Sequence, residues 1–76
     1  MIKVEGYMSY LMATIKKNLN KNMENITKEM LQFQGKSSKI VIKISDFKTN
    51  KIYYLLEIDN CNNVWNNNMV EEYKVD

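Results

Sequence analysis

The sequence lacks several residue types on which enzymes and nucleic-acid-binding proteins commonly rely. It has no histidine, the usual general base and metal ligand, and no arginine, the side chain that pairs bidentately with phosphate and guanine. It has no proline and only two glycines, so a glycine-rich phosphate-binding loop is absent. Its single cysteine, Cys61, excludes an internal disulfide. We find no catalytic constellation, and we predict that the chain is not an enzyme and binds no cofactor or metal ion.

The length and the hydropathy pattern indicate one small domain, residues 1–76, of which 45% are hydrophobic. No run of about 18 apolar residues is present, and the first six residues lack the apolar region of a signal peptide. We therefore expect no membrane association and a cytoplasmic location, which is the host cytoplasm if a phage encodes the chain. The many lysines, asparagines and isoleucines are typical of AT-rich coding DNA, as in low-GC bacteria, phages and plasmids.

Residues 7–34 show the spacing of one long amphipathic helix. Apolar residues recur every three or four positions and would share one helical face. They are Met8, Leu11, Met12, Ile15, Leu19, Met23, Ile26, Met30 and Phe33. Gly35 stands where a C-cap is expected. The helix starts either at Ser9, with residues 2–4 as a short leading strand, or near Gly6.

After residue 38 the hydrophobic period changes to two, which predicts strands at 39–45 and 52–58 joined by a hairpin turn at 46–51. The first strand would place Ile40, Ile42 and Ile44 on one face, and the better core face of the second strand is Ile52, Tyr54, Leu56 and Ile58. Residues 69–76 form a third strand, a short helix or a frayed tail. The predicted fold class is therefore α+β, with one long N-terminal amphipathic helix packed on a small antiparallel β-meander of two or three strands.

Such a helix carries a longer apolar stripe than two or three strands can cover. Self-association is the simplest way to bury the remainder, and a closed dimer is the favoured form. The expected oligomer interface is formed by Met8, Leu11, Met12, Ile15 and Leu19.

Charge is distributed unevenly along the chain, although the net charge is only +2. Residues 1–56 hold ten lysines and four acidic residues, whereas residues 57–76 hold one lysine and five acidic residues. The polar face of the predicted helix carries Lys16, Lys17, Lys21 and Lys28. This face is either an ordinary solvated surface or a docking surface for an anionic partner.

The aromatic residues of the second half suggest a binding surface. Tyr53 and Leu55 point away from the predicted core, and Trp65 needs cover from its own domain or from a partner. With Tyr73, Glu71 and Glu72 they form the predicted protein-partner surface. We expect a small non-enzymatic binding protein, an accessory or inhibitory factor of phage or mobile-element type that occupies a host protein surface as a homo-oligomer. The alternative is a nucleic-acid or nucleotide-binding module that uses the lysine face and the strand aromatics.

Overall fold

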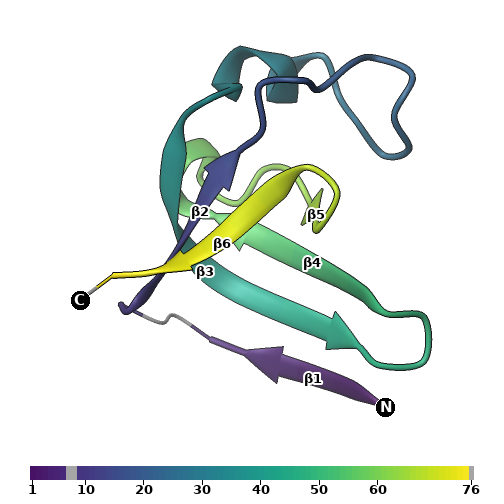
Figure 1. Ribbon diagram of the computed structural model, residues 1–76, viewed down its shortest axis with the longest axis vertical. Helices are drawn as coiled ribbons and strands as arrows, with labels where there is room; N and C mark the ends of the chain where they lie inside the picture. Colours follow the sequence, from purple (N-terminus) through teal and green to yellow (C-terminus); the bar gives the residue numbers. More distant parts are fainter. Residues whose placement is uncertain (7–8, 76) are drawn as a thin grey trace.

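The computed structural model describes residues 1–6 and 9–75 as a curled antiparallel sheet (Figure 1). The strands are β1 (Ile2–Glu5), β2 (Leu11–Ile15), β3 (Ser37–Asp46), β4 (Lys51–Leu56), β5 (Trp65–Asn66) and β6 (Val70–Lys74). Two short 3-10 helices complete the fold, η1 (Glu29–Phe33) and η2 (Glu57–Asp59). Within the described ranges there is no α-helix, so the α+β prediction was wrong. It follows that no helix in this part of the chain could cross a membrane.

The strands follow the order β5–β4–β3–β2–β6, and every pair is antiparallel. The long strand β3 belongs to both halves of the sheet, since its first residues pair with β2 and its last residues pair with β1 and β4. The register between β3 and β4 shifts between Ile40 and Ile42. A bulge of this kind bends a strand and increases its twist, and here it lies where the sheet curls into a half-barrel (Figure 1).

The predicted helix is replaced at residues 11–15 by strand β2. Leu11, Ala13 and Ile15 are buried, whereas Met12 and Thr14 are only half-buried, which is a period of two. Leu11 and Ile15 are four residues apart, so they fit a helical and a strand period equally well. The strand forms instead of the helix because β2 lies between β3 and β6, and these strands provide hydrogen-bond partners for its backbone N–H and C=O groups on both sides.

The remainder of the predicted helix is a long loop, residues 16–36, that contains η1. Its asparagines favour turns: the side chain of Asn20 accepts a hydrogen bond from the N–H of Asn22 at 2.9 Å, and Asn25 adopts a left-handed conformation with φ 64°. Gly35, with φ 81°, closes the base of the loop by donating its N–H to the carbonyl of Ile15 at 2.8 Å. Gly35, which was expected to cap a helix, therefore closes the 16–36 loop.

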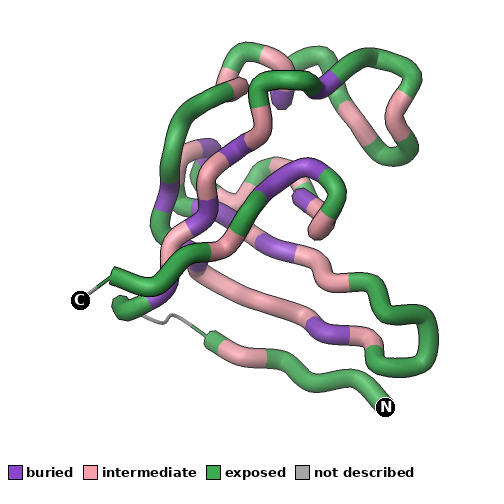
Figure 2. The backbone as a smooth tube through the Cα atoms, in the orientation of Figure 1, coloured by how far each residue is buried: buried purple, intermediate pink, exposed green. Residues whose placement is uncertain are grey.

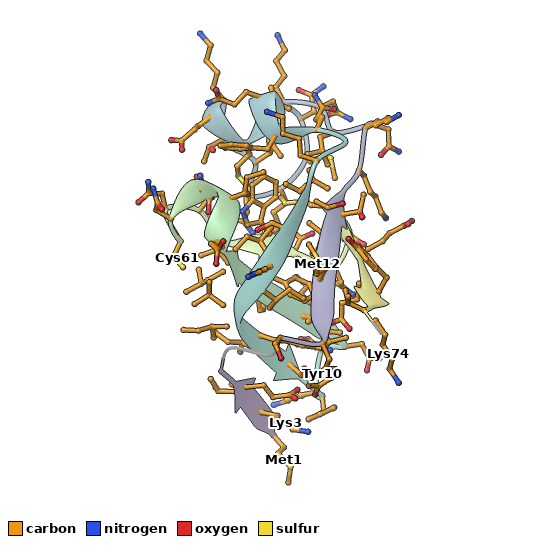
Figure 3. The ribbon with its side chains drawn as sticks, turned by 90° about the vertical axis from the view of Figure 1, so that its left-hand side faces the viewer. Met1, Lys3, Tyr10, Met12, Cys61 and Lys74 are labelled. Carbon is orange, nitrogen blue, oxygen red and sulfur yellow. The ribbon has the colours of Figure 1, made fainter. Side chains whose placement is uncertain are left out.

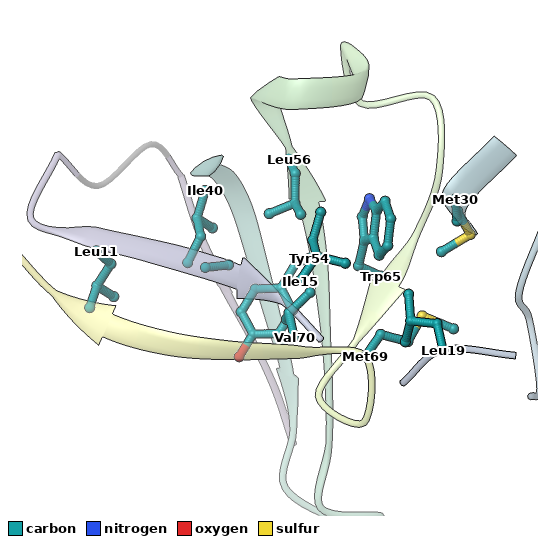
Figure 4. Packing of buried hydrophobic residues seen from close by; sticks show 11 residues of the cluster. Leu11, Ile15, Leu19, Met30, Ile40, Tyr54, Leu56, Trp65, Met69 and Val70 are labelled. Carbon is teal, nitrogen blue, oxygen red and sulfur yellow. The ribbon is translucent and has the colours of Figure 1, made fainter. Parts of the chain in front are cut away.

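The core lies inside the half-barrel and is completed by the 16–36 loop (Figure 2). Its buried hydrophobic residues are Leu11, Ala13, Ile15, Leu19, Met30, Ile40, Tyr54, Leu56, Trp65, Met69 and Val70. Trp65 is fully buried between strand β4 and Met30 of the loop (Figure 4). Phe33 meets the Trp65 ring edge to face, with 6.3 Å between ring centroids. The loop thus supplies part of the core, although it has little regular structure.

The hairpin prediction is confirmed, since β3 and β4 pair around a turn in which Asn50 has φ 59°. Tyr54 and Leu56 face the core as predicted. The prediction that Ile40, Ile42 and Ile44 share one face of their strand was wrong: Ile40 is buried, but beyond the bulge Ile42 and Ile44 turn to the outer face of the sheet, opposite Leu55 and Tyr53. Of the three alternatives predicted for residues 69–76, the structure has the strand, which is β6 over residues 70–74.

Candidate functional site

Two adjoining hollows lie between the 16–36 loop and the β4–β5 pair. They share Asn25, Tyr53 and Asn66, and have volumes of about 320 and 390 Å³. The first is also lined by Met23, Glu24, Lys51, Asn67 and Asn68. The second is also lined by Thr27, Met30 and Val64. We call these two hollows together the asparagine groove.

Strand register brings the centre of this groove together. Tyr53 of β4 lies directly opposite Asn66 of β5, so both side chains emerge on the outer face of the sheet. The turn after β5 is held by its own asparagines: the N–H of Asn67 donates to the carbonyl of Ile52 at 3.0 Å, and the Asn66 side chain accepts the N–H of Asn68 at 2.9 Å. The amides of the β5–β6 turn are therefore positioned before any ligand arrives.

A chain of side-chain hydrogen bonds anchors the opposite wall of the groove. Thr27 donates to the side-chain oxygen of Asn63 at 3.0 Å, and the amide of Asn63 donates to Asp59 Oδ2 at 2.9 Å. The indole N–H of Trp65 donates to the same oxygen at 3.1 Å. Asp59 is 4% exposed, and its Oδ1 has no hydrogen-bond partner among the described residues. The 16–36 loop is thus tied to the buried tryptophan through a buried carboxylate.

A second polar cluster, formed by Lys43, Tyr54 and Glu72, lies inside the half-barrel. Glu72 accepts the Tyr54 hydroxyl at 2.6 Å and pairs with the Lys43 ammonium at 2.5 Å. Burial, together with the hydrogen bond to Glu72, raises the pKa of Tyr54. Burial alone would raise the pKa of Glu72, but hydrogen bonds from Lys43 and Tyr54 outweigh it and hold that pKa below its usual value. A tyrosine with a raised pKa is a poor nucleophile, so we assign this cluster to stability.

The predicted partner-binding residues are dispersed by the fold. Tyr53 lines the groove and Leu55 is half-buried on the same sheet face, but Trp65 is enclosed in the core. Glu72 is engaged inside the half-barrel. Glu71 and Tyr73 are exposed on β6, at the other end of the strand order from β4 and β5.

The other predicted surfaces are also changed by the fold. The four lysines Lys16, Lys17, Lys21 and Lys28 all lie in the 16–36 loop and do not share a helical face. Of the predicted oligomer interface, Leu11, Ile15 and Leu19 are buried in the chain's own core and Met12 is half-buried. Met8 lies outside the described residues.

The groove asparagines were not predicted from the sequence as binding residues. The available signal for Asn66, Asn67 and Asn68 was the clustering of asparagines at residues 60–68, and the sequence around Asn25 carried no such signal. No group of three or more potential metal ligands occurs in the described ranges. Comparison with models of protein families, with curated proteins and with solved structures found no match. Function must therefore be argued from the geometry of the chain itself.

Proposed function

We propose that this chain is a small non-enzymatic protein-binding module whose asparagine groove takes an extended polypeptide segment of a partner. The observation that carries the proposal is that asparagines from two distant segments line the same hollows as Tyr53. An asparagine side chain offers two donors and one acceptor, the same groups that an extended backbone needs. Tyr53 adds a large contact surface at little entropic cost.

Charge within the groove favours a polypeptide over a nucleic acid. Its lining contains one lysine, Lys51, and one acidic residue, Glu24, so it carries no net charge. Proteins that bind single strands combine aromatic platforms with a positively charged groove, because phosphate attraction supplies much of the affinity. The nucleic-acid alternative has the aromatic platform but lacks this positive charge.

The groove also offers room for apolar side chains. Met23, which is half-buried, lines the first hollow, and Val64, which is 53% exposed, lines the second. Hollows of about 300 Å³ or more are of the size that small ligands occupy. Methionine side chains adapt to differently shaped partners, so we expect the groove to accept apolar residues on a segment whose backbone the asparagines bind.

Such a module would act by occupying a surface of its target. We propose the role of an accessory or inhibitory factor of phage or mobile-element type, acting on a host protein as a homo-oligomer. Size, composition and the absence of catalytic groups in the sequence support this role.

Selection from a library of extended peptides, followed by calorimetric titration of the selected sequences, tests the proposal. Asn25→Gly removes one amide but keeps a residue that tolerates φ 64°. Asn66→Asp keeps the acceptor for the N–H of Asn68 but replaces the amide donors with a charge. We expect each variant to weaken binding about tenfold or more while thermal unfolding changes little.

Phe47→Ala is the matched control, because Phe47 is 56% exposed and lies in the β3–β4 turn outside the groove. It should bind as the wild type does. The proposal is refuted if no peptide is selected or if both groove variants bind normally. A parallel titration with single-stranded oligonucleotides at two salt concentrations would support the nucleic-acid alternative if binding is salt-dependent and is lost in the groove variants.

A further inference from the structure

Strand β1 is an edge strand that presents apolar side chains to solvent. Among the described residues it pairs only with β3, at the end of the molecule marked by Met1 and Lys3 (Figure 3). Ile2 is 63% exposed and Val4 is 64% exposed. Natural edge strands are usually protected from pairing with other chains, by charge, proline, a bulge or a covering element. Strand β1 has no proline, and its two charged residues, Lys3 and Glu5, have opposite signs, so a strand with the complementary charge order can pair with it.

The backbone of β1 shows which groups face this open edge. The N–H of Phe47 donates to the carbonyl of Met1 at 3.0 Å, and the pairing continues in register from Ile2 opposite Asp46 to Glu5 opposite Lys43. Hydrogen-bonded and non-hydrogen-bonded pairs alternate along antiparallel strands. Lys3 and Glu5 therefore direct their N–H and C=O groups to β3, whereas Ile2 and Val4 direct theirs away from it.

We propose that β1 pairs antiparallel with β1 of a second copy of this chain, on a two-fold axis that passes through Val4. In this register Val4 lies opposite Val4 of the second copy, and the two exchange both backbone hydrogen bonds. Lys3 of each chain then lies opposite Glu5 of the other, in the non-hydrogen-bonded positions where side chains approach most closely. Both pairs join opposite charges, which stabilises cross-strand neighbours.

The neighbouring registers are less favourable. Lys3 and Glu5 share one face of the strand, with 3.9 Å between the ammonium and a carboxylate oxygen within the chain. A two-fold axis through Lys3 would use the same outward-directed groups of Ile2 and Val4, but it would oppose the two Lys3 side chains in a non-hydrogen-bonded pair, where like charges repel most strongly. A shift by one residue would place the side chains of the two copies on opposite faces of the joined sheet.

The proposed register also joins apolar surface on the outer face. Val4 lies opposite Ile44, and Ile44 lies opposite Tyr53, so one apolar row crosses three strands of each copy. Pairing at Val4 unites the two rows and covers part of the exposed valine. The resulting sheet runs β5–β4–β3–β1 in one copy and back through the same strands in the other. It places an asparagine groove at each end, but its formation does not depend on the proposed function.

Analytical ultracentrifugation over a range of concentrations tests the backbone part of the proposal. We expect a monomer–dimer equilibrium for the wild-type chain. Val4→Pro removes an N–H that points away from β3, a placement in which proline is tolerated on edge strands. It should weaken dimerisation about tenfold or more and leave the thermal unfolding of the monomer nearly unchanged. Val4→Ala keeps the N–H and should weaken dimerisation less.

A charge exchange tests the register. In a homodimer of Lys3→Glu, both cross-strand pairs between positions 3 and 5 are acidic, and in a homodimer of Glu5→Lys both are basic. Each variant alone should therefore dimerise about tenfold more weakly or worse. An equimolar mixture of the two should form a heterodimer, because both of its pairs again join opposite charges. The double variant K3E/E5K should dimerise as the wild type does. A wild-type chain that stays monomeric at about 1 mM, a dimer that survives Val4→Pro, or a mixture that shows no gain refutes the proposal.

Discussion

The cluster of Lys43, Tyr54 and Glu72 makes a prediction about the pH dependence of stability. Glu72 lies on β6, Tyr54 on β4 and Lys43 on β3, so one carboxylate connects three strands across the interior of the half-barrel. Glu72→Gln keeps the size of the side chain but removes its charge. At neutral pH this replaces the carboxylate acceptor of both hydrogen bonds with a neutral amide oxygen, which weakens them, and it leaves Lys43, whose side chain is 16% exposed, without its counter-ion.

Hydrogen bonds to charged groups contribute about 1.5–3 kcal/mol each when they are well protected from solvent. The side chain of Glu72 is 25% exposed, so water recovers part of this loss. We expect Glu72→Gln to lower the free energy of unfolding by about 1–2 kcal/mol at pH 7. For a domain of this size, that corresponds to a melting temperature lower by about 4–16 °C.

The sign of the pH dependence follows from the direction of the pKa shift. The pKa of Glu72 is lower in the folded chain than in the unfolded one, so its contribution is present above the unfolded value of about 4.3. That contribution is lost as the pH falls through the folded pKa. The difference between the wild type and Glu72→Gln should therefore shrink at about pH 3. Tyr54 has a raised pKa, so its contribution is present below about pH 10 and is lost as the pH rises further.

Urea denaturation of the wild type and of Glu72→Gln at about pH 7, 5 and 3 measures the difference in their free energies of unfolding. Glu71→Gln is the matched control, because the neighbouring Glu71 is exposed and its substitution should change stability by less than about 0.5 kcal/mol. The reasoning fails if Glu72→Gln is as stable as the wild type at neutral pH. It also fails if the difference between the two is the same at acidic and neutral pH.

Two further substitutions test the 16–36 loop. Thr27→Val removes the hydroxyl that donates to Asn63 and also accepts the N–H of Met30 at 3.3 Å. Amide hydrogen exchange in residues 20–28 should therefore accelerate, and the free energy of unfolding should fall by about 1 kcal/mol. Unchanged exchange would contradict the role of Thr27 in anchoring the loop. Gly35→Ala places a side chain at φ 81°, with its Cβ 3.2 Å from Lys17, and should destabilise the fold by about 1–2 kcal/mol in denaturant titrations. Gly6→Ala, whose Cβ meets nothing within 4 Å, is the control and should change stability little.

The hairpin could be predicted from the sequence because its information is local. Alternating apolar residues on either side of a polar turn predict two adjacent strands, and β3 and β4 bear this out. The bulge at Ile40 and Ile42 was not predictable from the alternation, which continues unbroken through it. One irregular pair therefore moved Ile42 and Ile44 to the outer face.

The long helix was predicted wrongly because its deciding contacts are distant in sequence. Leu11 and Ile15 fit both periods, and the strand is selected by pairing with β6, which lies about 60 residues away. The segment between residues 18 and 25 was predicted to be helical, although its asparagine side chains favour local turns. Tyr53 was correctly predicted to point away from the core, but the groove around it requires the register with Asn66 and the return of the loop.

Some of the asparagines are explained by the backbone conformation that they adopt, and this separates them from the asparagines that line the groove. Among residues 1–6 and 9–75, the non-glycine residues with positive φ are three asparagines, Asn25, Asn50 and Asn60, and Cys61, which follows Asn60. In a chain with two glycines, asparagine supplies the left-handed positions that turns require. Asn50 and Asn60 are accounted for by this backbone role and line no part of the groove. Asn25 has the same backbone role, yet its amide also reaches the groove, so Asn25→Gly can separate recognition from folding.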